Sequence, residues 1–175
     1  ATGDLTNGPN YEQNQTLLGH SSFATDAQTK ANGSPDDRFS RKIVKLATPV
    51  ASPQDLGIPA EYRFTIYSSG SSSAPVIRNE ELVLMRAEAR WFTGDKTNAV
   101  ADLNVIRTVS GGLGPSFVTA SSADAQFVQA LLYERRYSLM LEGFRWVDAR
   151  RFNQLSTLPR DLPTHFVAIV EPIPL

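Results

Sequence analysis

Residues 79–111 read NEELVLMRAEARWFTGDKTNAVADLNVIRTVSG, and this stretch predicts two helices joined by a tight turn. Asn79 can cap the first helix, and the acidic Glu80 and Glu81 suit the electropositive first turn. Good helix formers follow, and Gly94 is a natural stop. The stretch therefore predicts that helices shape at least this part of the chain.

The second helix is expected at 98–109, where apolar residues recur on one helical face. Those residues are Ala99, Val100, Leu103 and Ile106. Small residues, Ala87 and Ala89 on the first helix and Ala99 on the second, allow two antiparallel helices to approach closely. The pattern at 79–109 resembles a tetratricopeptide hairpin, of which a stack needs about three copies, and only one convincing copy occurs in this chain.

Two more helices are predicted after the Gly-rich break at 110–115. One should run over 122–142, with Gly143 as its left-handed C-cap, and a short one over 144–152. The last residues, 165–175, are expected to be extended because they end in two prolines.

The first part of the chain, 1–78, is rich in Asn, Gly, Ser, Thr and Pro and is expected to be loop-rich. Short strands are predicted at 42–46 and 62–67. The predicted organisation is thus a loop-rich segment, 1–78, followed by a helical region, 79–175. The fold class is mainly α, a tetratricopeptide-like α-α superhelix with a loop-rich first half and a few short strands.

Composition excludes several classes of function. The chain has 175 residues and a formal net charge of −1, so it offers no excess of positive charge for nucleic acid. It has no Cys, and His20 and His165 lack metal-ligand spacing, so neither a metal nor another cofactor is predicted. No apolar run approaches the roughly 20 residues that span a bilayer.

The densest charged stretch is YERRYSLMLEGFRWVDARR, residues 133–151. Arg135 and Glu142, seven residues apart, should share a helix face, and Arg145 lies three residues before Asp148. Acidic residues such as Glu134 could serve a glycosidase, but neighbouring Arg would keep them ionised, whereas a general acid needs a raised pKa. The cluster therefore favours structural ion pairs over catalysis, and no enzyme is predicted.

Aromatic side chains in the loop-rich half are the available platforms for a sugar ring. They are Tyr11, Phe23, Tyr62 and Tyr67. Their positions are scattered, and the same segment could consist of connecting loops over a helical body.

Several motifs, in this order and spacing, are similar to the C-terminal part of the SusD/RagB family of outer-membrane nutrient-binding lipoproteins. The motifs are Arg78 to Glu80 with Ala87-Glu88-Ala89, Leu103-Asn104 with Arg107, Glu134-Arg135-Arg136, Glu142-Gly143 with Arg145-Trp146 and Asp148, and Pro172-Ile173-Pro174. DDRF at 36–39 also resembles an Asp-x-Arg that precedes this region in many members. The likeness covers about residues 36–175.

The resemblance implies a SusD-like helical fold and a non-enzymatic protein that binds oligosaccharide or another nutrient. It also implies delivery to a SusC-like TonB-dependent transporter barrel at the cell surface. Membrane attachment would come only through a lipid anchor upstream of this segment. The alternative is a helical-repeat module that binds protein and no small ligand.

Overall fold

The computed structural model describes residues 17–50, 58–67 and 72–170. The chain divides into two compact units. Unit 1 comprises residues 1–78 and 108–114, and unit 2 comprises residues 79–107 and 115–175. Segment 108–114 therefore belongs to the unit formed by the N-terminal part of the chain, although it follows the helical hairpin in sequence.

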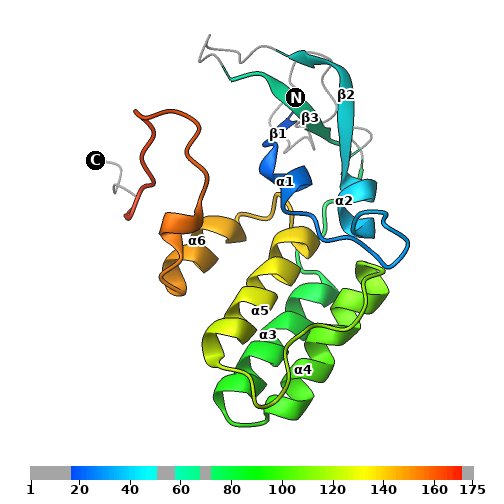
Figure 1. Cartoon of the computed structure of the whole chain (residues 1–175), viewed down its shortest axis with the longest axis vertical. Coiled ribbons are helices and arrows are strands. Elements are labelled where there is room, and N and C mark those ends of the chain that lie inside the picture. Colours follow the sequence, from blue (N-terminus) through cyan, green and yellow to red (C-terminus); the bar gives the residue numbers. More distant parts are fainter. Residues whose placement is uncertain (1–16, 51–57, 68–71, 171–175) are drawn as a thin grey trace, which may run out of the picture. The chain divides into compact units, whose positions relative to one another are not determined.

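Unit 1 contains a three-stranded antiparallel sheet in the order β1-β3-β2 (Figure 1). Its strands are β1 (Leu18–Gly19), β2 (Ile43–Val50) and β3 (Ala60–Phe64). Ile43 pairs with Phe64 in the register and both side chains are buried. The strands predicted at 42–46 and 62–67 exist, but β3 ends at Phe64, and β1 was not predicted.

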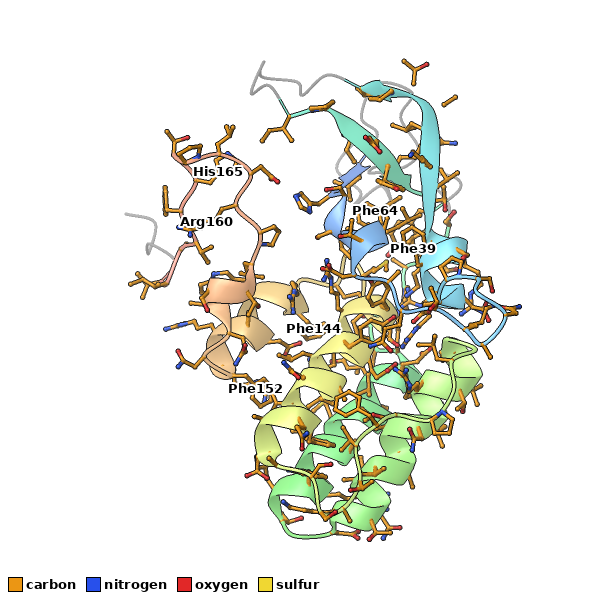
Figure 2. The ribbon with its side chains drawn as sticks, viewed as in Figure 1. Phe39, Phe64, Phe144, Phe152, Arg160 and His165 are labelled. Atoms are coloured by element: carbon orange, nitrogen blue, oxygen red, sulfur yellow. The ribbon has the colours of Figure 1, made fainter. Side chains whose placement is uncertain are left out.

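Aromatic rings pack on the elements around this sheet. The ring of Phe23, in α1 (Ser22–Thr25), meets that of Phe64 edge-on at 5.4 Å between centroids. Phe39, in α2 (Asp37–Lys42), meets Tyr62 in the same manner at 6.2 Å. Figure 2 shows Phe39 and Phe64 in this part of the molecule. Edge-to-face pairs of this kind stabilise a small core beyond simple burial.

The DDRF stretch forms a buried ion pair at the start of α2. Asp36 caps the helix by accepting a hydrogen bond from the backbone N–H of Arg38 at 2.8 Å. The same carboxylate binds the Arg38 guanidinium through Nε at 3.0 Å and Nη2 at 2.5 Å. Both residues are almost fully buried. The Asp-x-Arg spacing thus serves helix capping and charge neutralisation together.

Gly112 approaches α2 more closely than any side chain would allow. Its φ is +66°, and a Cβ at this position would overlap Oδ2 of Asp37. Asp37 is itself held by Nζ of Lys30 at 2.5 Å and by its backbone N–H, which donates to the Gly111 carbonyl at 2.9 Å. The glycine therefore lets segment 108–114 lie against α2 within unit 1.

Unit 2 is helical, as the sequence predicted. Its α-helices are α3 (Asn79–Phe92), α4 (Lys96–Val105), α5 (Asp124–Ser138) and α6 (Phe144–Arg151), with a 3₁₀ turn, η3, at Leu155–Thr157. α3, α4 and α5 run side by side (Figure 1).

The hairpin prediction is confirmed, with Gly94 at φ +97° between its helices. The α4 helix starts two residues earlier than expected and continues after Val105 as a π-helical turn, η2 (Ile106–Ser110).

The core of unit 2 lies between α3, α4 and α5. It consists of Leu84, Ala87, Trp91, Ala99, Leu103, Ile106, Val118, Phe127, Ala130 and Leu131. Trp91 stacks on Phe127 with centroids 4.2 Å apart and an interplanar angle of 5°. Its indole N–H donates to Oδ1 of Asp124 at 2.9 Å, so the buried ring leaves no polar group unsatisfied there. Hydrogen bonds from Lys96 and Trp91 lower the pKa of Asp124.

A three-residue charge cluster joins α3 to α4. Arg86 binds both carboxylate oxygens of Asp102, at 2.9 and 2.7 Å, and Arg90 adds a third hydrogen bond at 2.7 Å. Burial alone would raise the pKa of Asp102, but the hydrogen bonds and positive charges of Arg86 and Arg90 outweigh burial and lower it. The carboxylate therefore stays ionised and ties the two helices of the hairpin together.

The predicted end of the third helix was wrong. α5 ends at Ser138 rather than at residue 142, and Leu141 adopts a left-handed φ of 66°. Gly143 has a positive φ as expected, but it precedes α6 instead of capping α5. Leu139 and Met140 are buried, so packing overrides the helix propensity of 139–142.

The described part of the last segment, 165–170, forms no strand, and residues 171–175 lie outside the described residues.

Within the described ranges, no helix has both the length and the apolar character needed to cross a bilayer.

Replacing Gly112 with Ala should lower the free energy of unfolding by about 1–3 kcal/mol, measured by urea denaturation. The new Cβ would displace the Asp37 carboxylate from Lys30 and would occupy a left-handed conformation. Gly114→Ala is the matched control, because nothing lies within 4 Å of its Cβ position. Equal stability of the two variants would contradict the close approach at Gly112.

Replacing Asp102 with Asn should cost about 1–3 kcal/mol of unfolding free energy at pH 7, because Arg86 and Arg90 lose their shared carboxylate. The pKa of Asp102 is lower in the folded state than in the unfolded state. The contribution of its carboxylate to the free energy of unfolding is therefore complete above the unfolded pKa of about 4, and it is lost as the pH falls through the folded-state pKa. The difference between wild type and variant should therefore shrink below about pH 4. The exposed Asp26→Asn should change stability by less than about 0.5 kcal/mol across the same range.

Candidate ligand-binding pocket

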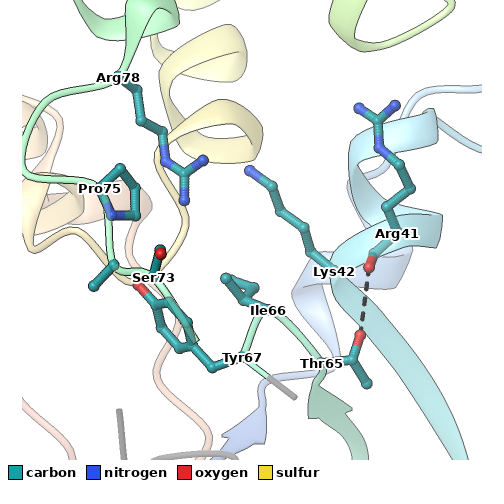
Figure 3. A pocket seen from close by; sticks show the side chains of 9 residues that line it. Arg41, Lys42, Thr65, Ile66, Tyr67, Ser73, Pro75 and Arg78 are labelled. Atoms are coloured by element: carbon teal, nitrogen blue, oxygen red, sulfur yellow. Dashed lines mark hydrogen bonds between the residues drawn. The ribbon is translucent and has the colours of Figure 1, made fainter. Parts of the chain in front are cut away.

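An open pocket of about 500 Å³ lies on unit 1, and we call it the Tyr67 pocket. It is lined by Arg41, Lys42, Thr65, Ile66, Tyr67, Ser73, Ala74, Pro75 and Arg78. Figure 3 shows these side chains around the hollow. Its volume falls within the range of small-molecule sites, about 300–1,000 Å³.

Three segments build the Tyr67 pocket. Arg41 and Lys42 form the last turn of α2, where positive charge complements the helix dipole. Residues 65–67 continue from the end of β3 and are fastened to that helix end. The Thr65 N–H donates to the Lys42 carbonyl at 2.8 Å, and its hydroxyl donates to the Arg41 carbonyl at 3.4 Å (Figure 3). Residues 73–78, leading to α3, supply the opposite wall.

The lining combines one aromatic ring with several hydrogen-bond donors. Tyr67 provides a ring and a hydroxyl, and Ile66 and Pro75 add apolar surface. Lys42 and Arg78 bring charged donors that point toward one another across the pocket (Figure 3). A ring face beside several donors is suited to a saccharide, whose C–H faces are apolar and whose hydroxyls accept hydrogen bonds.

A second pocket, of about 370 Å³, lies on unit 2 and has a different character. It is lined by Leu155, Ser156, Arg160, Phe166, Val167 and Ile169. Phe166 and Ile169 are largely exposed. With one charged residue and mostly aliphatic or aromatic walls, this pocket offers fewer partners to a polar ligand than the Tyr67 pocket does.

Of the four aromatic residues expected to bind sugar, the three that the structure describes do not line one common pocket. Tyr11 lies outside the described residues. Phe23 packs on Phe64 and Tyr62 on Phe39, and neither lines the Tyr67 pocket. Tyr67 does line it. A ligand-binding role for each of the four remains a prediction.

Sequence reasoning missed Lys42 and Arg78 as candidate site residues. They are far apart in the chain, and no spacing rule connects them. The signal that could have indicated Lys42 is its place in a basic Arg-Lys pair immediately before a predicted strand.

The charged stretch 133–151 forms interhelical ion pairs in unit 2. Nε of Arg135, on α5, donates to Oδ2 of Asp148, on α6, at 2.6 Å, and both side chains are nearly buried. Arg151 also donates to Asp148, at 3.2 Å, and binds Glu88 on α3. Glu134 accepts from Arg107 at 3.0 Å. Glu142 lies outside α5, so the expected shared helix face with Arg135 does not exist.

The Arg135 guanidinium also lies 5.2 Å from the centroid of Phe144, which begins α6. Figure 2 shows Phe144 and Phe152 at the two ends of α6. Arg145 occupies a half-buried position between Phe144 and Trp146 on α6. Arg135 therefore contacts α6 through both a carboxylate and an aromatic ring.

Among the described residues, no group of three His, Asp or Glu side chains is placed to hold a metal ion.

The fold is that of a SusD superfamily protein. A solved structure of such a protein from Bacteroides vulgatus matches with a TM-score of 0.56 at 20% sequence identity, over 74% of this chain and 32% of that chain. A curated relative, a SusD-like protein of Formosa agariphila, is 30% identical over 121 residues. The model of the SusD family matches residues 7–169. The chain belongs to the SusD family.

The curated relative is much longer than this chain. The alignment covers 65% of this chain and 24% of the relative. The chain thus spans about a quarter of the relative's length and about a third of the solved structure's.

Replacing Arg135 with Met should lower the free energy of unfolding by about 2–4 kcal/mol, because Asp148 loses its closest charged partner inside the protein. The remaining bond from Arg151 limits the loss. The control is Arg150→Met, at an exposed position on the same helix as Asp148, which should cost less than about 1 kcal/mol. Chemical denaturation of both variants makes the comparison, and an Arg135 variant as stable as the control would show that the buried pair contributes little.

Proposed function

We propose that this protein is a nutrient-binding component of an outer-membrane uptake system, that its ligand is a glycan, and that it has no catalytic activity. The observation that carries the proposal is membership of the SusD family across residues 7–169. The Tyr67 pocket supports a saccharide ligand, because it places an aromatic ring beside several hydrogen-bond donors. The ion-paired state of the carboxylates in unit 2 favours scaffolding over general acid catalysis.

The proposal extends to location and partner. The protein would act at the cell surface as part of an outer-membrane lipoprotein and pass its ligand to a SusC-like TonB-dependent transporter. Co-purification with such a transporter from native membranes tests this part. Recovery of the protein without any transporter, under conditions that preserve other outer-membrane complexes, would contradict it.

A second candidate is a protein-binding helical module. One observation favours it: Leu82, Met85 and Phe92 on α3 are each more than half exposed. These residues recur at i, i+3 and i+10, which places them on one side of α3, away from Leu84, Ala87 and Trp91 in the core. A protein partner could cover that side without any small ligand.

Calorimetry and affinity gel electrophoresis against a broad panel of neutral and acidic glycans should show binding of at least one glycan class. Tyr67→Ala should weaken that binding about five- to tenfold, through loss of ring contact. Phe117→Ala is the matched control, because Phe117 is an exposed aromatic residue on unit 2. Absence of binding across the whole panel would reject the glycan proposal and leave the protein-binding module.

A further inference from the structure

The pocket on unit 2, which we call the Arg160 pocket, is built from two segments that are fastened to α6. Its lining residues are Leu155, Ser156, Arg160, Phe166, Val167 and Ile169. The first segment is tied through the Gln154 N–H, which donates to the Ala149 carbonyl on α6 at 2.6 Å. The second is tied through the indole N–H of Trp146, also on α6, which donates to the Ala168 carbonyl at 2.7 Å. Helix α6 therefore holds both walls of the pocket.

The loop between the two walls has hydrogen bonds of its own. The His165 N–H donates to the Leu162 carbonyl at 3.0 Å, and the Asp161 N–H donates to Nδ1 of His165 at 3.3 Å. Figure 2 shows Arg160 and His165 on this loop. These bonds fix the loop without using the guanidinium of Arg160, which is left for other contacts.

Two hydrogen-bond donors of the Arg160 pocket have no partner in the part of the chain that the structure describes. Neither the Arg160 guanidinium nor the Ser156 hydroxyl takes part in a hydrogen bond or an ion pair there. Asp161 follows Arg160 in the chain but does not line the pocket. By contrast, Arg135 is bound by the buried carboxylate of Asp148. The charge and the donors of Arg160 are therefore open to a ligand.

The rest of the lining is apolar. Leu155 and Val167 are half-buried, whereas Phe166 is 85% exposed and Ile169 is 69% exposed. Covering this surface with an apolar ligand would remove it from water, which favours binding. A ligand that satisfies both parts of the pocket is apolar along most of its length and carries negative charge at one end.

A carboxylate suits the polar end of the pocket better than a phosphate does. The fork of a guanidinium pairs with the two oxygens of a carboxylate, and the hydroxyl of Ser156 can donate one more hydrogen bond. A phosphate monoester carries nearly two negative charges, whereas Arg160 is the one cation in the lining. The volume, about 370 Å³, is that of a small-molecule site.

We propose that the Arg160 pocket binds a small amphiphilic carboxylate, which is an apolar chain or ring that ends in one carboxylate group. Arg160 and Ser156 hold the carboxylate, and Phe166 and Ile169 cover the apolar part. This site is separate from the Tyr67 pocket, and the inference does not depend on the glycan-binding function proposed above.

Matched ligands test the proposal on the unaltered 175-residue chain. Octanoate is compared by calorimetry with octanol, which has the chain without the charge, and with acetate, which has the charge without the chain. Octanoate should bind at least about tenfold more tightly than either. Phenylbutanoate, which replaces most of the chain by a ring, distinguishes an aryl carboxylate from an alkyl one.

Protein variants locate the binding. Arg160→Gln should weaken octanoate about tenfold and change the affinity for octanol less than about twofold. Arg63→Gln, at an exposed position on β3, removes the same charge outside the pocket and is the matched control. Phe166→Ala should weaken both ligands about three- to tenfold, and Phe117→Ala, at another exposed aromatic residue, should not. Thermal unfolding confirms that each variant remains folded.

Three outcomes overturn the proposal. If the folded chain binds no octanoate, the site does not exist. If octanoate and octanol bind within about twofold of one another, the carboxylate is not recognised. If Arg160→Gln and Phe166→Ala both match their controls, binding occurs elsewhere on the chain. The glycan titrations use other ligands and another pocket, so each of these results leaves the glycan-binding function standing.

Discussion

The close approach of α3 and α4 is the constraint on which the helical unit depends. Ala87 and Ala99 have no exposed surface, and Leu103 is equally enclosed, so the two helices meet through small and aliphatic side chains. This spacing brings Asp102 within reach of two arginines on α3. It also leaves the large Trp91 ring directed at α5, where it stacks on Phe127. A bulkier residue at either alanine would separate the helices and disturb both contacts.

The hairpin was predictable because its determinants are local: helical periodicity, acidic residues at the start and a glycine at the turn. The end of α5 was not predictable from the same rules. Leu139, Met140, Leu141 and Glu142 are good helix formers, yet the chain leaves the helix at Ser138. Burial of Leu139 and Met140, and the salt bridge from Arg135 to Asp148 on α6, are contacts beyond the helix that local propensity does not include.

The Tyr67 pocket was likewise only partly predictable from the sequence. Tyr67 could be selected by residue type, but nothing in the sequence separates it from Phe23 and Tyr62, whose rings pack on other aromatic rings. The pocket depends on hydrogen bonds from Thr65 to the carbonyls of Arg41 and Lys42, which set the exit of β3 against the end of α2. Such backbone contacts leave no pattern of residue spacing, so sequence alone could name candidates for the site but could not assemble them.

The near balance of charge affects how a ligand would be selected. With a net charge of −1, the chain has little overall field to draw anions from a distance, and salt screens what remains beyond about 8 Å at physiological ionic strength. Charged side chains, such as those that line the Tyr67 pocket, therefore act on a ligand mainly at short range. Selection of a ligand at such a site therefore depends mainly on the dissociation rate rather than on the association rate.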